Sequence, residues 1–126
     1  MGTTTSPVRS YRDLKVWERS VDLTVECHAL AKRLSRKSAG ALAGQLERAA
    51  ISIPSNIAEG NGRRGRTEYL KHLSIANGSL LEVETQLILL ERLALFTPDE
   101  LARARQLAVE VGRLLAGLIR KLRQDR

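Results

Sequence analysis

The sequence predicts an all-α protein, an antiparallel up-down-up-down four-helix bundle, on three observations. Apolar residues recur at three- and four-residue steps almost throughout the chain, which is the period of an amphipathic helix. Aromatic residues make up only 3% of the chain, and strands draw on aromatic and β-branched residues. The segments that interrupt the period are short, so consecutive helices should be antiparallel neighbours.

The chain of 126 residues is long enough for one domain. Residues 1–10 are polar and without period, and we expect a disordered N-terminal tail there, followed by a single bundle domain over 11–126. The first helix is expected over about residues 13–37, with Leu14 at the start of its apolar face. Residues 38–40 supply the turn that follows.

The second helix is expected to carry an apolar stripe from Leu42 to Ile57, with Pro54 inside it. Proline removes one backbone hydrogen bond and clashes with the carbonyl four residues earlier, here that of Ala50. Two alternatives are possible at this residue: a break in the helix, or one helix with a kink. The stripe stays in phase across Pro54, which favours one helix kinked at Pro54. Gly60 then suits the helix C-cap.

The third and fourth helices follow the loop of residues 62–66. The third carries leucines in two rows, and the fourth begins at a strong start signal. There Thr97 can cap, Pro98 suits the first helical position, and Glu100 can complete a capping box. The first and third helices have wider apolar coverage than one bundle face needs, which predicts self-association.

The sequence contains no pattern typical of a disulfide, a membrane span or a metal site. Cys27 is the single cysteine, so no intramolecular disulfide is possible, and a reduced thiol is typical of a cytoplasmic protein. No apolar stretch approaches the length of a membrane span. His28 and His72 do not follow a glutamate at the spacing of a carboxylate-bridged metal bundle. We therefore expect no catalysis, no cofactor, no metal and no membrane partner.

Polar residues of the kind found in bundle interiors gather in the second and third helices. A catalytic core is one interpretation, and an enzyme built on Glu59, Glu82 and Glu84 is the weakest of the function classes. A structural hydrogen-bond and ion-pair network is favoured, with Arg48 paired to Glu82 or Glu84. The predicted network consists of Gln45, Arg48, Ser52, Asn56, Glu59, Ser79 and Glu82.

The charge is unevenly distributed once a bundle is assumed. The start of the first helix, the loop of residues 62–66 and the end of the fourth helix should share one pole. That pole collects 12 cations and five anions, a surplus equal to the net charge of +7 of the whole chain. This surplus predicts polyanion binding, with solubilising charge as the alternative. The predicted nucleic-acid-binding residues are Arg12, Lys15, Arg19, Arg63, Arg64, Arg66, Lys71, Arg120, Lys121 and Arg123.

Four segments resemble a bacterial four-helix-bundle family, named for the ribosomal-RNA intervening-sequence protein. The most specific reads QLERAAISIPSNIAEG over residues 45–60. The others are YRDLKVW over 11–17, IANGSLLEVET over 75–85 and VGRLL over 111–115. One segment departs from the family pattern: residues 34–40 lack the Phe/Leu-Pro step and the Glu-Arg pair usual before the second helix.

The resemblance implies a ring-like homopentamer of four-helix bundles. It also implies kinship with the accessory variability proteins of diversity-generating retroelements, which bind nucleic acid and a reverse transcriptase. From the residues themselves we expect a homo-oligomer that contacts the backbone of RNA or DNA without reading bases. The alternative is an oligomeric scaffold for a protein partner, whose charge has no role in binding.

Overall fold

The computed structural model describes residues 10–63 and 65–124, and every regular element in these ranges is helical. The all-α four-helix prediction is therefore confirmed. Residues 1–9, which were expected to form a disordered tail, lie outside the described residues, as do Arg64 and residues 125–126. The elements are a 3₁₀ turn η1 (Tyr11–Asp13) and the helices α1 (Lys15–Arg36), α2 (Gly40–Asn61), α3 (Arg66–Arg92) and α4 (Pro98–Gln124).

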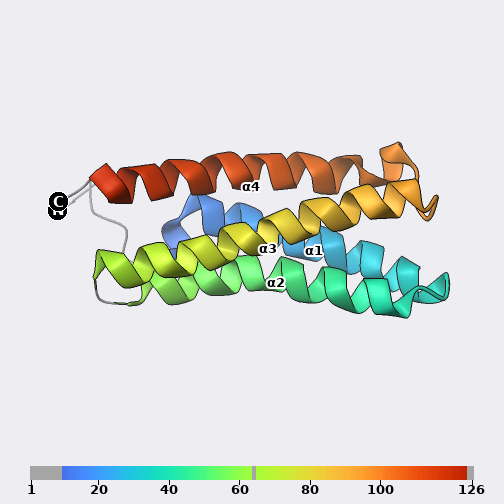
Figure 1. Ribbon diagram of the computed structural model, residues 1–126, viewed down its shortest axis with the longest axis horizontal. Coiled ribbons are helices and arrows are strands. Elements are labelled where there is room, and N and C mark those ends of the chain that lie inside the picture. Colours follow the sequence, from blue (N-terminus) through green and yellow to red (C-terminus); the bar gives the residue numbers. More distant parts are fainter. Residues whose placement is uncertain (1–9, 64, 125–126) are drawn as a thin grey trace.

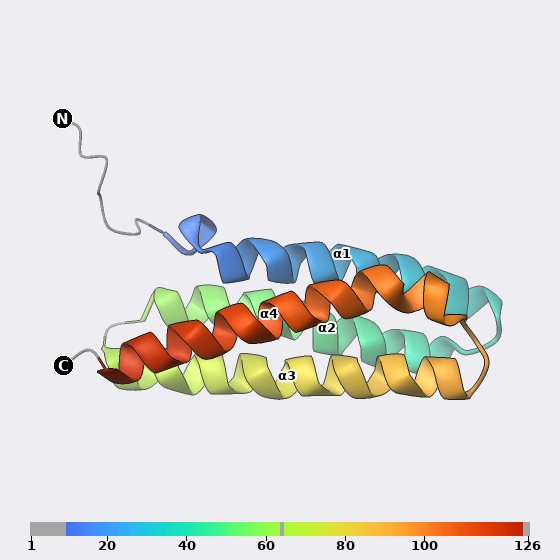
Figure 2. The same cartoon turned by 90° about the horizontal axis from the view of Figure 1, so that it is seen from above.

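The four helices lie along one long axis, and each reverses the direction of the helix before it (Figure 1). Each helix contacts two others: α2 and α4 both pack against α1 and α3. The face between α1 and α2 is therefore opposite the face between α3 and α4. α1 begins nearer the middle of the bundle than the neighbouring ends of α2 and α4 (Figure 2).

Leucine, isoleucine and alanine side chains from all four helices fill one continuous core. α2 contributes mainly small residues to this core. Three larger side chains of α2, those of Leu46, Ile53 and Ile57, are each at most 1% exposed. Small side chains allow the backbones of neighbouring helices to approach closely, so α2 can pack tightly against both α1 and α3.

Ser10, which we assigned to the tail, caps a short turn that precedes α1. The Ser10 hydroxyl accepts a hydrogen bond of 3.1 Å from the backbone N–H of Arg12 and caps the short turn η1. The Tyr11 ring then packs edge-on against the Trp17 ring, with the ring centroids 5.1 Å apart. The 3₁₀ turn delays the start of α1 to Lys15, two residues later than expected.

α2 continues unbroken through Pro54, so the interpretation as a break is wrong, while the kink stays a prediction. Proline has no N–H to donate to the carbonyl of Ala50. The Thr24 hydroxyl of α1 lies 3.1 Å from that carbonyl oxygen and 2.8 Å from the carbonyl oxygen of Ser20, between which its one proton is shared. A neighbouring helix thus supplies the donor that Pro54 lacks.

The start of α4 agrees with the capping-box prediction. The Thr97 hydroxyl accepts from the backbone N–H of Glu100 at 3.2 Å, and the Glu100 carboxylate accepts from the backbone N–H of Thr97 at 2.8 Å. Two backbone donors that the helix cannot satisfy internally are therefore paired.

Gly60 is buried inside α2 and is not the C-cap that we predicted, because the helix extends to Asn61 and is capped by Gly62. A Cβ atom at Gly60 would lie 2.7 Å from the Cβ of His72 and 3.1 Å from the Tyr69 ring. Both neighbours belong to α3, so the absent side chain is what lets α3 approach the last turns of α2.

We expect Gly60→Ala to lower the free energy of unfolding by about 1–3 kcal/mol, because the new methyl group must displace α3. Gly78→Ala in α3 is the matched control: its Cβ would meet nothing within 4 Å, and alanine favours a helix interior by about 0.5–1 kcal/mol. Urea denaturation of the two variants checks this. Equal stability changes in the two variants would contradict the close approach at Gly60.

Candidate nucleic-acid interface

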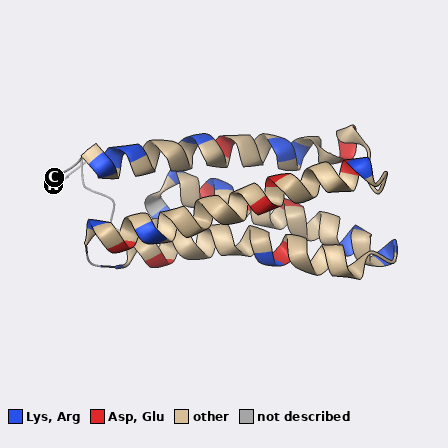
Figure 3. Cartoon of the chain, viewed as in Figure 1, with Lys and Arg blue, Asp and Glu red and all other residues tan. Residues whose placement is uncertain are grey.

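Nine of the ten predicted nucleic-acid-binding residues are described by the structure, and Arg64 is not. They come from three places in the chain: η1 and the first turns of α1, the α2–α3 connection with the start of α3, and the last turns of α4. Lys and Arg residues of α3 and α4 lie at the end of the bundle where α3 begins and α4 ends, and others lie along α4 and at the opposite end (Figure 3). η1 and α1, the elements that carry Arg12, Lys15 and Arg19, begin nearer the middle of the bundle than the adjoining ends of α2 and α4 (Figure 2).

Two of the nine cations are engaged by carboxylates. Arg19 lies 3.0 Å from Asp22 and 3.1 Å from Glu110 of α4, and these partners raise the pKa of Arg19. Arg63 forms an ion pair of 2.7 Å with Glu59 one turn earlier in the chain. The hydrogen bond from Arg63, aided by the nearby His72, lowers the pKa of Glu59. These two cations are partly neutralised within the chain itself.

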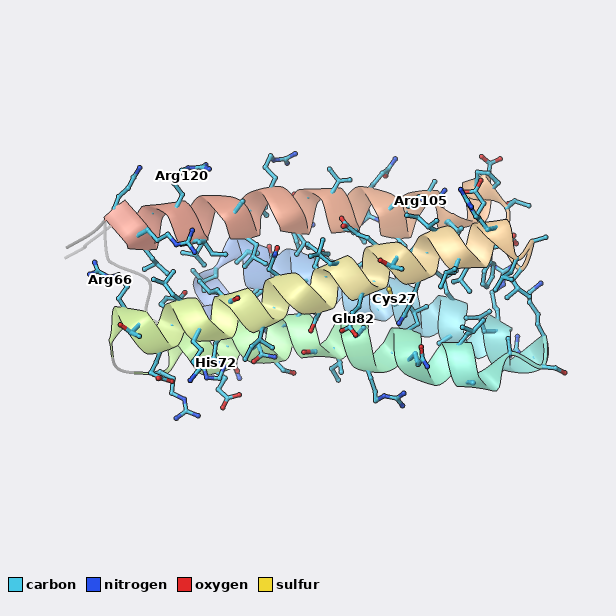
Figure 4. All side chains as sticks on the ribbon, viewed as in Figure 1. Cys27, Arg66, His72, Glu82, Arg105 and Arg120 are labelled. Atoms are coloured by element: carbon cyan, nitrogen blue, oxygen red, sulfur yellow. The ribbon has the colours of Figure 1, made fainter. Side chains whose placement is uncertain are left out.

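The remaining seven cations form no ion pair with any carboxylate in the described parts of the chain. All seven are exposed, and Arg12 also lies over the Tyr11 ring, 5.7 Å from its centroid. Arg66 and Arg120, from α3 and α4, are both labelled at this end of the molecule (Figure 4). We call the set the basic pole: Arg12, Lys15, Arg66, Lys71, Arg120, Lys121 and Arg123.

The opposite end of the bundle also has cations, but several of them have partners there. Arg33 pairs with Glu100, and its guanidinium lies 4.8 Å from the centroid of the Phe96 ring. Arg105 pairs with Glu91 at 2.5 Å, and the Lys37 ammonium lies 5.5 Å from the Phe96 centroid. Carboxylates therefore engage two cations at this end, while Lys32, Arg36, Arg92 and Arg103 are exposed and form no ion pair with a described carboxylate.

The pairing of Glu100 should be visible in the pH dependence of stability. Its hydrogen bonds from the Thr97 backbone and then from Arg33 lower the pKa of Glu100 from 4.5 to about 2. Because this pKa is lower in the folded state, the stabilisation is present above pH 4.5 and is lost as the pH falls through about 2. Glu100→Gln should thus lower the urea midpoint at pH 7 and match the wild type near pH 2. Asp99→Asn, with no described ion pair, serves as the control.

Part of the predicted polar network is present between α2 and α3. The Ser79 hydroxyl donates to Ser52 Oγ at 2.8 Å, and the Asn56 amide donates to the same oxygen at 3.1 Å. His72 Nδ1 lies 3.1 Å from Asn56 Oδ1 and is therefore the donor of that bond. His72 was not among the predicted network residues. Its position opposite Asn56 becomes evident only when the register of α2 and α3 is known.

The predicted buried pair of Arg48 with Glu82 or Glu84 is wrong. Arg48 is exposed and forms no ion pair with a described carboxylate, because it lies outside the core-facing stripe of α2, beside Gly44. Glu82 and Gln45 are exposed as well, and Glu59 pairs with Arg63. Gln45, Arg48 and Glu82 line a shallow hollow of about 510 Å³ between α2 and α3. Gln86 lines it too, and its buried Oε1 has no hydrogen-bond partner among the described residues.

Cys27 lies within the core at 0% exposure. Burial, and secondarily the negative charge of Glu26, raises the pKa of its thiol to about 12. The thiolate that nucleophilic chemistry needs is therefore scarce at neutral pH. Among residues 10–63 and 65–124, no three metal-ligating side chains of the His, Cys, Asp and Glu types gather at one point, and none of the helices there is long and apolar enough to cross a bilayer.

The fold and the basic pole together define a class: a small, basic, all-α four-helix bundle. The family model of the 23S rRNA-intervening sequence protein matches residues 12–117, so the chain belongs to that family. A solved structure from Bacteroides thetaiotaomicron VPI-5482, a protein of unknown function from the S23 ribosomal protein family, is similar. It has 27% sequence identity and a TM-score of 0.79, and the match covers 82% of this chain and 97% of that one. No curated protein matches.

Proposed function

We propose that this chain is a cytoplasmic, non-enzymatic homo-oligomer that binds the backbone of RNA or DNA through its basic pole. The observation that carries the proposal is the set of seven exposed cations without a described carboxylate partner. Phosphate contacts by Lys and Arg supply most sequence-independent affinity for nucleic acid. The family's association with ribosomal RNA agrees with such a ligand. The resemblance to retroelement accessory proteins adds a reverse transcriptase as a candidate protein partner.

Two exposed apolar faces support self-association. Between α1 and α2, Val25 is 65% and Ile51 is 56% exposed, beside shallow hollows lined mainly by apolar side chains. Between α3 and α4, Ile88 is 53% and Val109 is 63% exposed. The two faces lie on opposite sides of the bundle and differ in composition, so contact between them is heterologous. Heterologous contacts form a closed ring where the rotation from one copy to the next closes, and a ring-like pentamer is what the family resemblance implies.

The alternative function is an oligomeric scaffold that binds a protein partner, with no role for nucleic acid. The same apolar faces favour it, since an exposed apolar surface serves a foreign protein as well as a second copy. The two functions differ in what the basic pole does, and only nucleic-acid binding requires its charges.

Reversing the charges at the basic pole should abolish binding. We expect Arg66→Glu, Arg120→Glu and Arg123→Glu together to weaken affinity for a labelled RNA at least about 100-fold, because three attractive charges become repulsive. All three side chains are exposed, so the fold should be retained. Arg63 is omitted because Glu59 already engages it. Fluorescence anisotropy at low salt, with circular dichroism as a check of folding, measures the effect.

The matched control reverses three exposed cations near the other end of the bundle, Arg36→Glu, Arg92→Glu and Arg103→Glu. It changes the net charge by the same amount, so it should weaken binding much less if position matters. A larger loss of affinity in the control than in the basic-pole variant would mean that the nucleic-acid-binding surface lies at the other end of the bundle. Absence of binding by the wild type at low salt would favour the scaffold.

The heterologous contact can be tested by complementation. Ile51→Glu and Ile88→Glu each place a charge on one exposed apolar face, and each variant alone should be monomeric in light scattering at micromolar concentration. Mixed together, they retain one intact contact, between the α3–α4 face of the first and the α1–α2 face of the second. The mixture should therefore form dimers. A monomeric wild type, or variants that stay monomeric when mixed, would contradict the arrangement.

A further inference from the structure

A hollow of about 540 Å³ lies between α3 and α4 at the end of the bundle that carries the basic pole. Small and polar side chains leave the space: Ser74 and Asn77 of α3 face Ala116 of α4. The hollow follows the stripe of the α3–α4 face on which Ile88 and Val109 lie, but at the other end of that stripe. Its volume is within the range of small-molecule sites.

The walls of the hollow combine two kinds of chemistry. Arg120 and Arg123 stand one turn apart on α4, and neither forms an ion pair with a described carboxylate. Leu70 and Ile119 give an apolar wall, while Ser74, Asn77 and Gln124 provide hydrogen-bond donors and acceptors. Free phosphate or a duplex backbone would use only the arginines. A nucleotide uses both, since its phosphate is anionic and its base has an apolar face with polar edges.

We propose that this hollow takes one unstacked nucleotide of a single-stranded nucleic acid, with the phosphate on Arg120 and Arg123 and the base against Leu70 and Ile119. The inference rests on the proposed function and adds the class of ligand. The remaining cations of the basic pole, among them Arg66 and Lys71 on the α3 side, contact the phosphates on either side of that nucleotide. The bases of a duplex are stacked and paired, so they do not enter a hollow of this size.

A comparison of single strand with duplex separates base entry from charge. Duplex DNA has the higher charge density, one charge per about 1.7 Å, so a surface that contacts only phosphates should prefer the duplex. We expect the opposite order: a single strand of about twelve nucleotides should bind about tenfold more tightly than its duplex at equal salt. A strand of the same length with abasic residues carries the same phosphates and should bind as weakly as the duplex.

A variant that fills the hollow without changing charge tests its location. Ala116 is exposed on α4 and lines the hollow, so Ala116→Met should reduce single-strand affinity about tenfold and leave duplex affinity unchanged. Ala102→Met, at an exposed position near the start of α4, is the matched control and should change neither affinity. Methionine favours a helix almost as strongly as alanine, so both variants should fold.

The outcomes distinguish this inference from the proposed function. Tighter binding of the duplex, equal binding of the abasic strand, or an unchanged affinity in Ala116→Met would overturn the single-nucleotide site and leave backbone binding intact. Absence of binding by every strand at low salt would overturn both.

Discussion

The close approach of α3 to α2 at Gly60 is the constraint on which the polar network between these helices and the position of the basic pole depend. A Cβ at this position would overlap His72, so the distance between the two helices is set by a residue without a side chain. That distance places His72 against Asn56 and Ser79 against Ser52. The same contact fixes the first turns of α3, and therefore Arg66 and Lys71, beside the end of α2.

A second constraint acts on the other side of α2. Pro54 leaves the Ala50 carbonyl without its helical donor, and the Thr24 hydroxyl of α1 supplies one. α2 thus packs against α3 through the space left by its own Gly60, and it receives from Thr24 of α1 a hydrogen-bond donor that Pro54 cannot supply. Both features lie in the segment of residues 45–60 that most clearly resembles the family, so that segment specifies how α2 packs.

The helical period was sufficient to predict four helices and the capping box at Thr97, because these features depend on residues close together in sequence. Side-chain pairing between helices was not predictable in the same way. Arg48 was expected inside, yet it lies just beyond the core-facing stripe and reaches solvent. Gly60 was assigned to a C-cap on local grounds, and its role in packing depends on the position of α3, which no local pattern contains.

The candidate nucleic-acid interface, too, was predictable from the sequence only in part. Counting charges along the sequence indicated a cationic end, but it gave equal weight to Arg19, Arg63 and Arg120. In the folded chain the first two are engaged by carboxylates and the third has no described carboxylate partner, so neutralisation within the chain decides which cations are available. At the other end, Arg105 is engaged by Glu91, Arg33 by Glu100 and the Phe96 ring, and Lys37 by the Phe96 ring. Arg36, Arg92 and Arg103 are exposed there and form no ion pair with a described carboxylate.

The central claim is that unpaired cations bind phosphates, and the salt dependence of affinity tests it most directly. Each phosphate neutralised on a single strand contributes about −0.7 to the slope of log affinity against log salt concentration. With the seven cations of the basic pole available on each chain, several contacts made together predict a straight line with a slope of about −2 to −5 for a short strand. An affinity independent of salt, or no detectable binding at low salt, would contradict the account.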